Sequence, residues 1–142
     1  MKKLLLLSLT LCMHAIILQA QIITTVAGPG AGAGAYSGDG GLAINAGLGD
    51  LGFVYPAFDN AGNMYFATDF NNTIRKIDNA GIITTIAGKF NVMGTSGDGG
   101  PAINALLYHP SAIAIDKNNN IYFVDNVNDL IRKIDATGII TT

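Results

Sequence analysis

The sequence contains no tryptophan, no glutamate, a single cysteine and only two histidines among its 142 residues. Cys12 lies within the first twenty residues, so a chain that has lost them carries no thiol, no disulfide and no cysteine-ligated metal. Without glutamate, the chain lacks the bidentate ligand that ends an EF-hand calcium loop. His109 is then its only imidazole, which is too few for a multi-histidine metal site. The sequence therefore predicts no cofactor and no metal.

The first twenty residues have the pattern of a secretory signal peptide. Lys2 and Lys3 form a positive region, residues 4–18 are mainly apolar, and Ala20 is a small residue before a predicted cut at Gln21. A membrane anchor is one alternative, but the run is short for a span. A lipoprotein is another, but the residue before Cys12 is bulky. We expect a secreted protein, extracellular or at the cell surface, with the periplasm as an alternative and no span after cleavage.

The charge balance argues against nucleic acid as a partner. Removing residues 1–20 leaves six basic residues against ten aspartates, a net charge of −4. Proteins that follow phosphate backbones need clustered lysine and arginine. We therefore expect a protein or glycan ligand and no nucleic acid.

Two copies of one unit follow the leader. Residues 74–85, IRKIDNAGIITT, return as 131–142, IRKIDATGIITT, an offset of 57 residues. The turn Ser-Gly-Asp-Gly-Gly at 37–41 returns at 96–100, an offset of 59. The segment IITTIAG at 82–88, which includes the end of the first copy, also has a counterpart near the start of the chain, IITTVAG at 22–28. A repeat of this kind predicts stacked units that bury their apolar faces against one another.

Each unit has the signals of four short strands joined by tight turns. The strands are rich in β-branched and aromatic residues, and clusters of Asp, Asn and Gly separate them. A four-stranded sheet that is apolar on both faces needs a similar sheet on each side, and radial stacking of such sheets gives a β-propeller. Pro56, in a first strand, suits an inner edge. The predicted strands are 54–58, 64–68, 73–77 and 82–87, then 112–115, 121–124 and 130–134.

The long connectors between units carry the remaining local signals. Residues 101–107 predict a short helix with Pro101 at its first position. Leu42 replaces that proline in the first copy, which weakens the signal there. The Ser-Gly-Asp-Gly-Gly turn supplies one carboxylate per copy, so a structural turn is favoured over a calcium loop. A structural calcium site in the channel stays a third hypothesis.

With these motifs in place, the chain resembles the NHL-repeat β-propellers. The resemblance lies in PSAIAID at 110–116, NIYFVD at 120–125 and LIRKID at 130–135. It is similar in particular to a bacterial secreted subgroup whose blades carry a Ser-Gly-Asp-Gly-Gly-Pro-Ala insertion. The resemblance implies an all-β fold, here about two blades plus a lone N-terminal outer strand. It implies little about activity, because the family includes scaffolds, adhesion domains, RNA binders and a few lyases.

The repeats also set the expected boundaries. Residues 1–20 are the signal peptide, and 21–28 are the outermost strand of a closing blade. Residues 29–88 are a blade with a glycine-rich leading connector, and 89–142 are a second blade cut off in its last strand. Because residues 21–28 have no partner strands upstream, we expect the sequence to be a fragment of a longer propeller.

The candidate binding residues lie in loops that a propeller places at one end. The connectors between second and third strands emerge on the same face as those between blades, so an acidic, amide-rich rim is expected there. Cations, sugars or a basic partner are its possible ligands, while the alternative is that these side chains cap turns. The candidates are Asp39, Asp69, Asn71, Asn72, Asp98, Asp125, Asn126, Asn128 and Asp129.

No catalytic group stands out. Arg75–Lys76 and Arg132–Lys133 lie in strands, where alternation sends the two side chains to opposite faces. One of each pair is expected to reach an aspartate of a neighbouring blade, so a structural ion pair or a solvated lysine is favoured over a binding patch. His109 lies near Ser111, but no nucleophile elbow surrounds them. The sequence predicts a non-catalytic binding or scaffold module. The alternative is a piece of a propeller lyase or lactonase whose catalytic residues lie in other blades.

Overall fold

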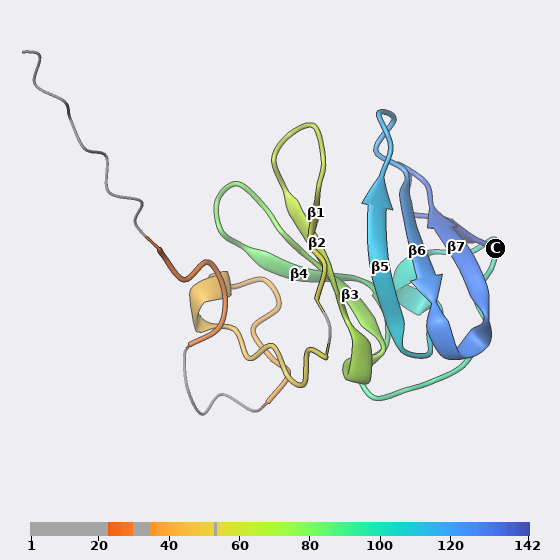
Figure 1. The fold of residues 1–142 in the computed structure, drawn as a ribbon, viewed down its shortest axis with the longest axis horizontal. Coiled ribbons are helices and arrows are strands. Elements are labelled where there is room, and N and C mark those ends of the chain that lie inside the picture. The colour runs from red at the N-terminus through yellow and green to blue at the C-terminus, as the bar shows by residue number, and fades with distance from the viewer. Residues whose placement is uncertain (1–22, 30–34, 53) are drawn as a thin grey trace, which may run out of the picture.

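The structure, a computed structural model, describes residues 23–29, 35–52 and 54–142 (Figure 1). It contains two four-stranded antiparallel sheets, each a meander of consecutive strands. This confirms an all-β fold built from propeller-type blades. The first sheet is β1 (Ala57–Phe58), β2 (Met64–Thr68), β3 (Thr73–Ile77) and β4 (Ile83–Gly88), and the second is β5 (Pro110–Ile115), β6 (Ile121–Asp125), β7 (Leu130–Ile134) and β8 (Ile140–Thr141).

Figure 1 shows the two sheets side by side, with the hairpin turns at one end and the connectors at the other. The predicted signal peptide and residues 30–34 of the glycine-rich connector lie outside the described residues. Within the described ranges, no helix is both long and apolar enough to cross a membrane. Residues 23–28, predicted as a closing strand, form no ladder with the rest of the described chain. Their place in another blade therefore stays a prediction.

The first strand of each blade differs from the prediction. β1 begins at Ala57, so Pro56 precedes the strand instead of lying in it. Proline has no N–H to give to a ladder, which accounts for the late start. In the second blade, β5 begins earlier than predicted, at Pro110, and its register shifts between Ser111 and Ile113. The residue between them, Ala112, has φ +27° and forms a bulge.

The connectors contain four single turns of 3-10 helix, not the longer helix predicted over 101–107. Pro101 precedes the turn with an extended backbone, φ −60° and ψ 129°, so it is not the first helical residue. The first copy forms the same turn with Leu42 in that place, which shows that the turn does not depend on proline. The turns are η1 (Ala43–Asn45), η2 (Asp69–Asn71), η3 (Ala102–Asn104) and η4 (Asn126–Asn128).

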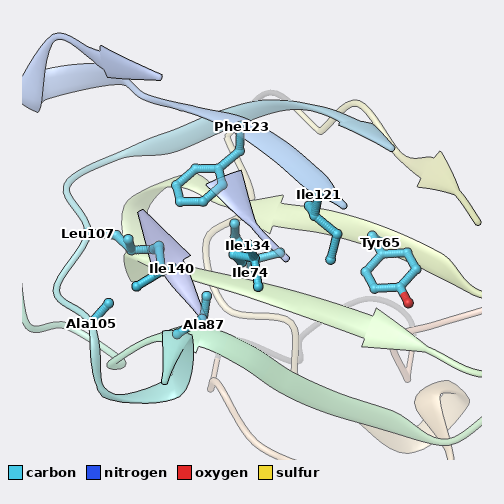
Figure 2. Close-up of a cluster of buried hydrophobic side chains, with 10 residues drawn as sticks. Tyr65, Ile74, Ala87, Ala105, Leu107, Ile121, Phe123, Ile134 and Ile140 are labelled. Carbon is cyan, nitrogen blue, oxygen red and sulfur yellow. The ribbon is translucent and has the colours of Figure 1, made fainter. Parts of the chain in front are cut away.

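One apolar cluster holds the two sheets together (Figure 2). Phe123 and Ile134 of the second sheet pack against Ile74 of the first, and Leu107 of the connector closes the cluster. All four side chains are at most 3% exposed. Burying one such side chain stabilises the fold by about 1.5–3 kcal/mol. The core therefore lies between the blades, and each sheet depends on its neighbour.

Aspartates close the hairpin turns as the sequence predicts. Asp116 Oδ1 accepts hydrogen bonds from the backbone N–H groups of Asn118 (2.8 Å) and Asn120 (2.9 Å). The hydrogen bonds from Asn120 hold the pKa of Asp116 below its ordinary value. The Thr137 hydroxyl does the same for the pKa of Asp135. At Asp59 burial raises the pKa, but hydrogen bonds from Asn63 and Tyr65 outweigh it, so this pKa is also lowered.

These lowered pKa values predict a loss of stability in acid. A carboxylate whose pKa is lower in the folded than in the unfolded state stabilises the fold above the unfolded pKa of about 3.9. That contribution is lost as the pH falls through the folded pKa. We expect the urea midpoint to fall between about pH 5 and pH 2, and to fall less in Asp116→Asn, which keeps an acceptor but does not titrate. The neutral change Asn118→Gln serves as control. An equal pH dependence in Asp116→Asn and the parent would contradict this account.

The two glycines that flank the aspartate in the Ser-Gly-Asp-Gly-Gly turn serve different purposes. A Cβ on Gly97, where φ is +109°, would lie 2.6 Å from Ala105 Cα. A Cβ on Gly99, where φ is +79°, would meet nothing within 4 Å. The first glycine is required by packing as well as by backbone conformation, and the second by conformation alone.

A matched pair of alanine substitutions tests this difference. We expect Gly99→Ala to lower the free energy of unfolding by about 1–2 kcal/mol, the cost of a left-handed L-residue. Gly97→Ala carries a similar conformational cost and also overpacks the contact with Ala105, which adds about 1–3 kcal/mol. Urea titration measures both values. Equal losses in the two variants would show that the contact with Ala105 does not matter.

Candidate functional site

The connectors between second and third strands meet the connectors between blades at one end of the molecule, as predicted. Asn71 Nδ2 donates to the backbone oxygens of Leu48 (3.2 Å) and Asp50 (3.0 Å). In the second blade, Asn128 Nδ2 donates to the Gly94 oxygen at 2.8 Å. We call this region the connector end. The side-chain amides of Asn71 and Asn128 hold the long connectors in place, and the N–H groups that do so are already hydrogen-bonded within the protein.

Three of the nine candidate residues are buried, which corrects the expectation of an open polar rim. Asn71 and Asn72 are 5% and 3% exposed, and Asp125 is fully buried. Asn72 Oδ1 accepts the His109 backbone N–H at 2.9 Å, and Asp125 Oδ1 accepts that of Tyr108 at 2.7 Å. Buried polar groups of this kind need internal partners. These side chains serve the architecture and are closed to a ligand.

Asp39 and Asp98 also differ from the expectation, because each binds a buried arginine. Asp39 Oδ1 lies 2.7 Å from Arg75 Nη2, and Asp98 Oδ1 lies 2.6 Å from Arg132 Nη2. Both guanidinium groups are fully buried, while both carboxylates are 45% exposed. Burial raises the pKa of Asp98, but hydrogen bonds from Thr142 and Arg132 outweigh it and leave the pKa below its ordinary value. The predicted structural ion pairs are present, but each aspartate lies in the arginine's own unit and not, as expected from the sequence, in a neighbouring blade.

Each arginine joins three segments of its own unit. Arg132 Nη1 donates to the Leu106 oxygen (3.0 Å) and Nη2 to the Ser96 oxygen (3.3 Å). Arg75 makes the equivalent bonds to Gly47 and Ser37, both at 3.0 Å. A guanidinium with five donors suits this use, because it can bind several oxygens in one plane. The long connector is thereby fixed to the face of its sheet.

The remaining four candidates are accessible at the connector end. Asn126 and Asp129 are exposed, and Asn128 is half-buried. Asp69 is also half-buried and its Oδ1 lies 2.6 Å from His109 Nδ1. A carboxylate that orients an imidazole corresponds to the aspartate and histidine of a catalytic triad, which also needs a nucleophile. Among the described residues, no hydroxyl is hydrogen-bonded to the His109 ring. The Asp69–His109 contact joins η2 of the first blade to the residue before β5.

Sequence reasoning missed a set of exposed apolar side chains at the same end. Phe70 and Val127 occupy equivalent positions in η2 and η4, and each is 50% exposed. The Phe70 ring also lies edge-on to His109, with the ring centres 5.2 Å apart. The signal was present in the sequence, as an apolar residue inside an otherwise polar connector in both repeats. We call the exposed set the apolar loop surface; it comprises Phe70, Phe90, Val92, Met93 and Val127.

Backbone hydrogen bonds bring the segments that carry these side chains to the same end of the molecule. The Asn91 N–H donates to the Asn71 oxygen at 3.1 Å, which brings residues 90–93 beside η2. The Val127 N–H donates to the Tyr108 oxygen at 3.2 Å, which brings η4 beside the start of β5. Exposed apolar side chains that gather among polar ones are typical of interaction sites. The connector end therefore combines a hydrogen-bonded base with exposed apolar side chains.

A known protein family matches the second of the two repeat units. The family described as Teneurin NHL domain matches residues 90–142. Teneurin-3 of Danio rerio is 59% identical over 46 residues, which is 32% of this chain and 2% of that protein. Teneurin-3 of Mus musculus is 56% identical over 46 residues, again 32% of this chain and 2% of that protein. The chain thus spans a small part of these relatives' length.

A solved structure shows the same fold. A structural genomics protein of unknown function from Bacteroides thetaiotaomicron VPI-5482 superposes with a TM-score of 0.56 and 21% identity, over 71% of this chain and 26% of that one. This likeness bears on the fold alone. The similarity to a bacterial secreted subgroup stays a prediction. The second blade is thus similar to the Teneurin NHL domain family, and the two blades and the internal repeat agree with the resemblance to NHL-repeat β-propellers.

Proposed function

We propose that this protein is a secreted, non-catalytic binding or scaffold module that takes a protein ligand at its connector end. The observation that carries the proposal is the apolar loop surface, because Phe70 and Val127 are presented at equivalent positions on two adjacent blades. Interface centres are enriched in aromatic residues and methionine, and this surface contains Phe70, Phe90 and Met93.

The base beneath the surface supports the proposal. Asn71, Asn128 and the two buried arginines hold the connectors to the sheets, so the surface is preorganised. A preformed surface loses little conformational freedom on binding, which favours affinity. A glycan is the second ligand class, and the exposed aromatic rings Phe70 and Phe90 offer it stacking surfaces.

The alternative function is a propeller lyase or lactonase, and the Asp69–His109 pair is the observation that favours it. Its imidazole is oriented by a carboxylate, as a general base requires. Yet the Asn72 side chain accepts the His109 backbone N–H, and the Phe70 ring lies against the imidazole. These contacts suit a fixed packing role, so we favour binding over catalysis.

Two variants test the proposed ligand surface. Wild-type protein is screened against panels of extracellular protein domains and of glycans, and each ligand found is titrated against Phe70→Ser/Val127→Ser and the control Ile103→Ser. Ile103 is 45% exposed on η3, outside the apolar loop surface. We expect a protein ligand whose affinity falls at least about tenfold in the double variant, or 1.4 kcal/mol, and is unchanged in the control.

The same screen separates the alternatives. A ligand found only among glycans would move the proposal to the second ligand class. Ligands that bind the double variant and wild type equally would contradict the site. Turnover of a lactone or glycan that His109→Gln abolishes would favour the enzyme.

A further inference from the structure

We propose that the protein binds a free amino acid with an apolar side chain in a pocket between its two blades, at the end of the molecule that carries the hairpin turns. This end lies opposite the connector end (Figure 1). The pocket has a volume of about 350 Å³, near the lower limit for small-molecule sites. The proposal concerns a different part of the molecule from the ligand surface proposed above, and it does not rest on that surface.

Both blades supply the walls of the pocket, and all its lining residues lie between 59 and 138. Tyr65, Lys76 and Ile86 come from strands of the first blade, while Ile121 and Ile134 come from strands of the second. Figure 2 shows Tyr65 beside Ile121 at one end of the apolar cluster, with the tyrosine hydroxyl directed away from the cluster. The pocket therefore continues the apolar cluster toward the hairpin turns and shares its isoleucines as an apolar wall.

Lys76 is the unusual residue of the first blade's wall. It is half-buried and lies on the same face of β3 as Ile74, which is 0% exposed between the blades. A charge in such a place is costly unless it has a partner. Lys76 Nζ lies 5.7 Å from the centre of the Tyr65 ring, at the upper end of the range for a cation over an aromatic ring. Among the described residues no carboxylate comes within 4.0 Å of this ammonium group, which leaves it open to an anionic group of a ligand.

Two carboxylates line the same pocket, and they differ in what they can still accept. Asp59 Oδ2 accepts hydrogen bonds from Asn63 Nδ2 (2.7 Å) and the Tyr65 hydroxyl (3.0 Å), and its Oδ1 accepts two backbone N–H groups. The hydrogen bonds to Asp135 from the described residues all end on Oδ1. Asp135 therefore keeps acceptor capacity on Oδ2, whereas Asp59 is occupied by its own turn.

The charges of the pocket favour a zwitterion. A simple anion would meet Lys76 but also two carboxylates, and a simple cation would meet the lysine ammonium. A molecule with one carboxylate and one ammonium group can accept from Lys76 and donate to Asp135 without adding net charge. The isoleucines of the wall, Ile86 and Ile121, suit an apolar side chain. A free apolar amino acid has these three features in one small molecule.

A contact between the hairpin turns holds this end of the two blades together. Asn60 Nδ2, in the first turn of the first blade, donates to the Lys117 oxygen in the first turn of the second blade at 3.1 Å. Together with the apolar cluster beneath, this contact fixes the distance between the walls. A pocket that is already formed loses little conformational freedom on binding, which favours a small ligand.

Calorimetric titration and amide NMR of the full-length chain with L-leucine test the ligand class. We expect saturable binding that shifts the amide signals of Ile121 and Gly138, which line the pocket. Leucinamide lacks the carboxylate, isocaproate lacks the ammonium group, and glycine lacks the apolar side chain. Each should bind at least about tenfold more weakly than leucine. Absence of saturable leucine binding, or equal affinity for leucinamide or isocaproate, would overturn the proposal.

Two matched pairs of variants test the site. Lys76→Met keeps the apolar stem and removes the charge, and its control is Lys117→Met, at an exposed lysine of the same end. Asp135→Asn has the control Asp78→Asn, because Asp78 closes the equivalent turn of the first blade but does not line the pocket. We expect leucine affinity to fall at least about tenfold in the first variant of each pair and to stay unchanged in the controls. Circular dichroism checks folding, and wild-type affinity in folded Lys76→Met or Asp135→Asn would overturn the site.

The variant Phe70→Ser/Val127→Ser separates this site from the ligand surface at the connector end. We expect it to bind leucine as wild type does. A loss of leucine binding in this variant would place the amino acid at the connector end and overturn the proposal. A failure of leucine to bind wild type would overturn the pocket and leave the ligand surface untouched.

Discussion

A fully buried arginine at the same place in each blade fixes the rest of the structure. Arg75 and Arg132 each have 0% exposure, and each binds two carbonyl oxygens and an aspartate of the connector. Removing a guanidinium from water is costly, and only good geometry with several acceptors compensates for it. In both blades Nε has no hydrogen-bond partner among the described residues, so the arrangement is not fully satisfied. The buried arginine therefore acts mainly by fixing the position of the connector against the sheet.

The second blade adds a carboxylate that the first lacks. Asp125, fully buried, lies 3.4 Å from Arg132 and stands where the first blade has Thr68. In the first blade Thr68 binds Thr73 instead, and the Arg75 guanidinium lies 4.5 Å from the centre of the Tyr36 ring. A cation over an aromatic face is a different way to compensate a buried charge. Two blades with one fold therefore balance the same arginine by different chemistry.

The sequence predicts the sheets well because their signals are local. The strands β2, β3 and β7 match the predicted bounds, since alternating β-branched runs and Asp-Gly turns determine them residue by residue. The conformation of the connectors is harder to predict from the sequence. The burial of Asn71 and Asn72 comes from packing of the long connectors and the second blade, which no local pattern reveals. The expected short helix at 101–107 is a single turn, because the backbone is extended again at Ala105.

The candidate site shows the same division. Its place at the connector end follows from the topology of a meander, and the predicted ion pairs follow from strand alternation at Arg75 and Arg132. The choice among polar residues did not follow, because an aspartate that binds a buried guanidinium looks like any other loop aspartate in sequence. The exposure of the Phe70 and Val127 side chains does not follow from the sequence, where each could equally be a core residue. Composition directs attention to the polar loop residues, whereas the proposed ligand surface consists of the exposed apolar residues among them.

Amide hydrogen exchange in Arg132→Met tests the central claim most directly. The Leu106 N–H donates to the Ser96 oxygen at 3.1 Å within the connector, and the Phe123 amide lies in the sheet. If the guanidinium holds the connector in place, the Leu106 amide loses protection in the variant by at least about tenfold more than the Phe123 amide. Equal changes at the two amides, or unchanged protection at Leu106, would contradict the account.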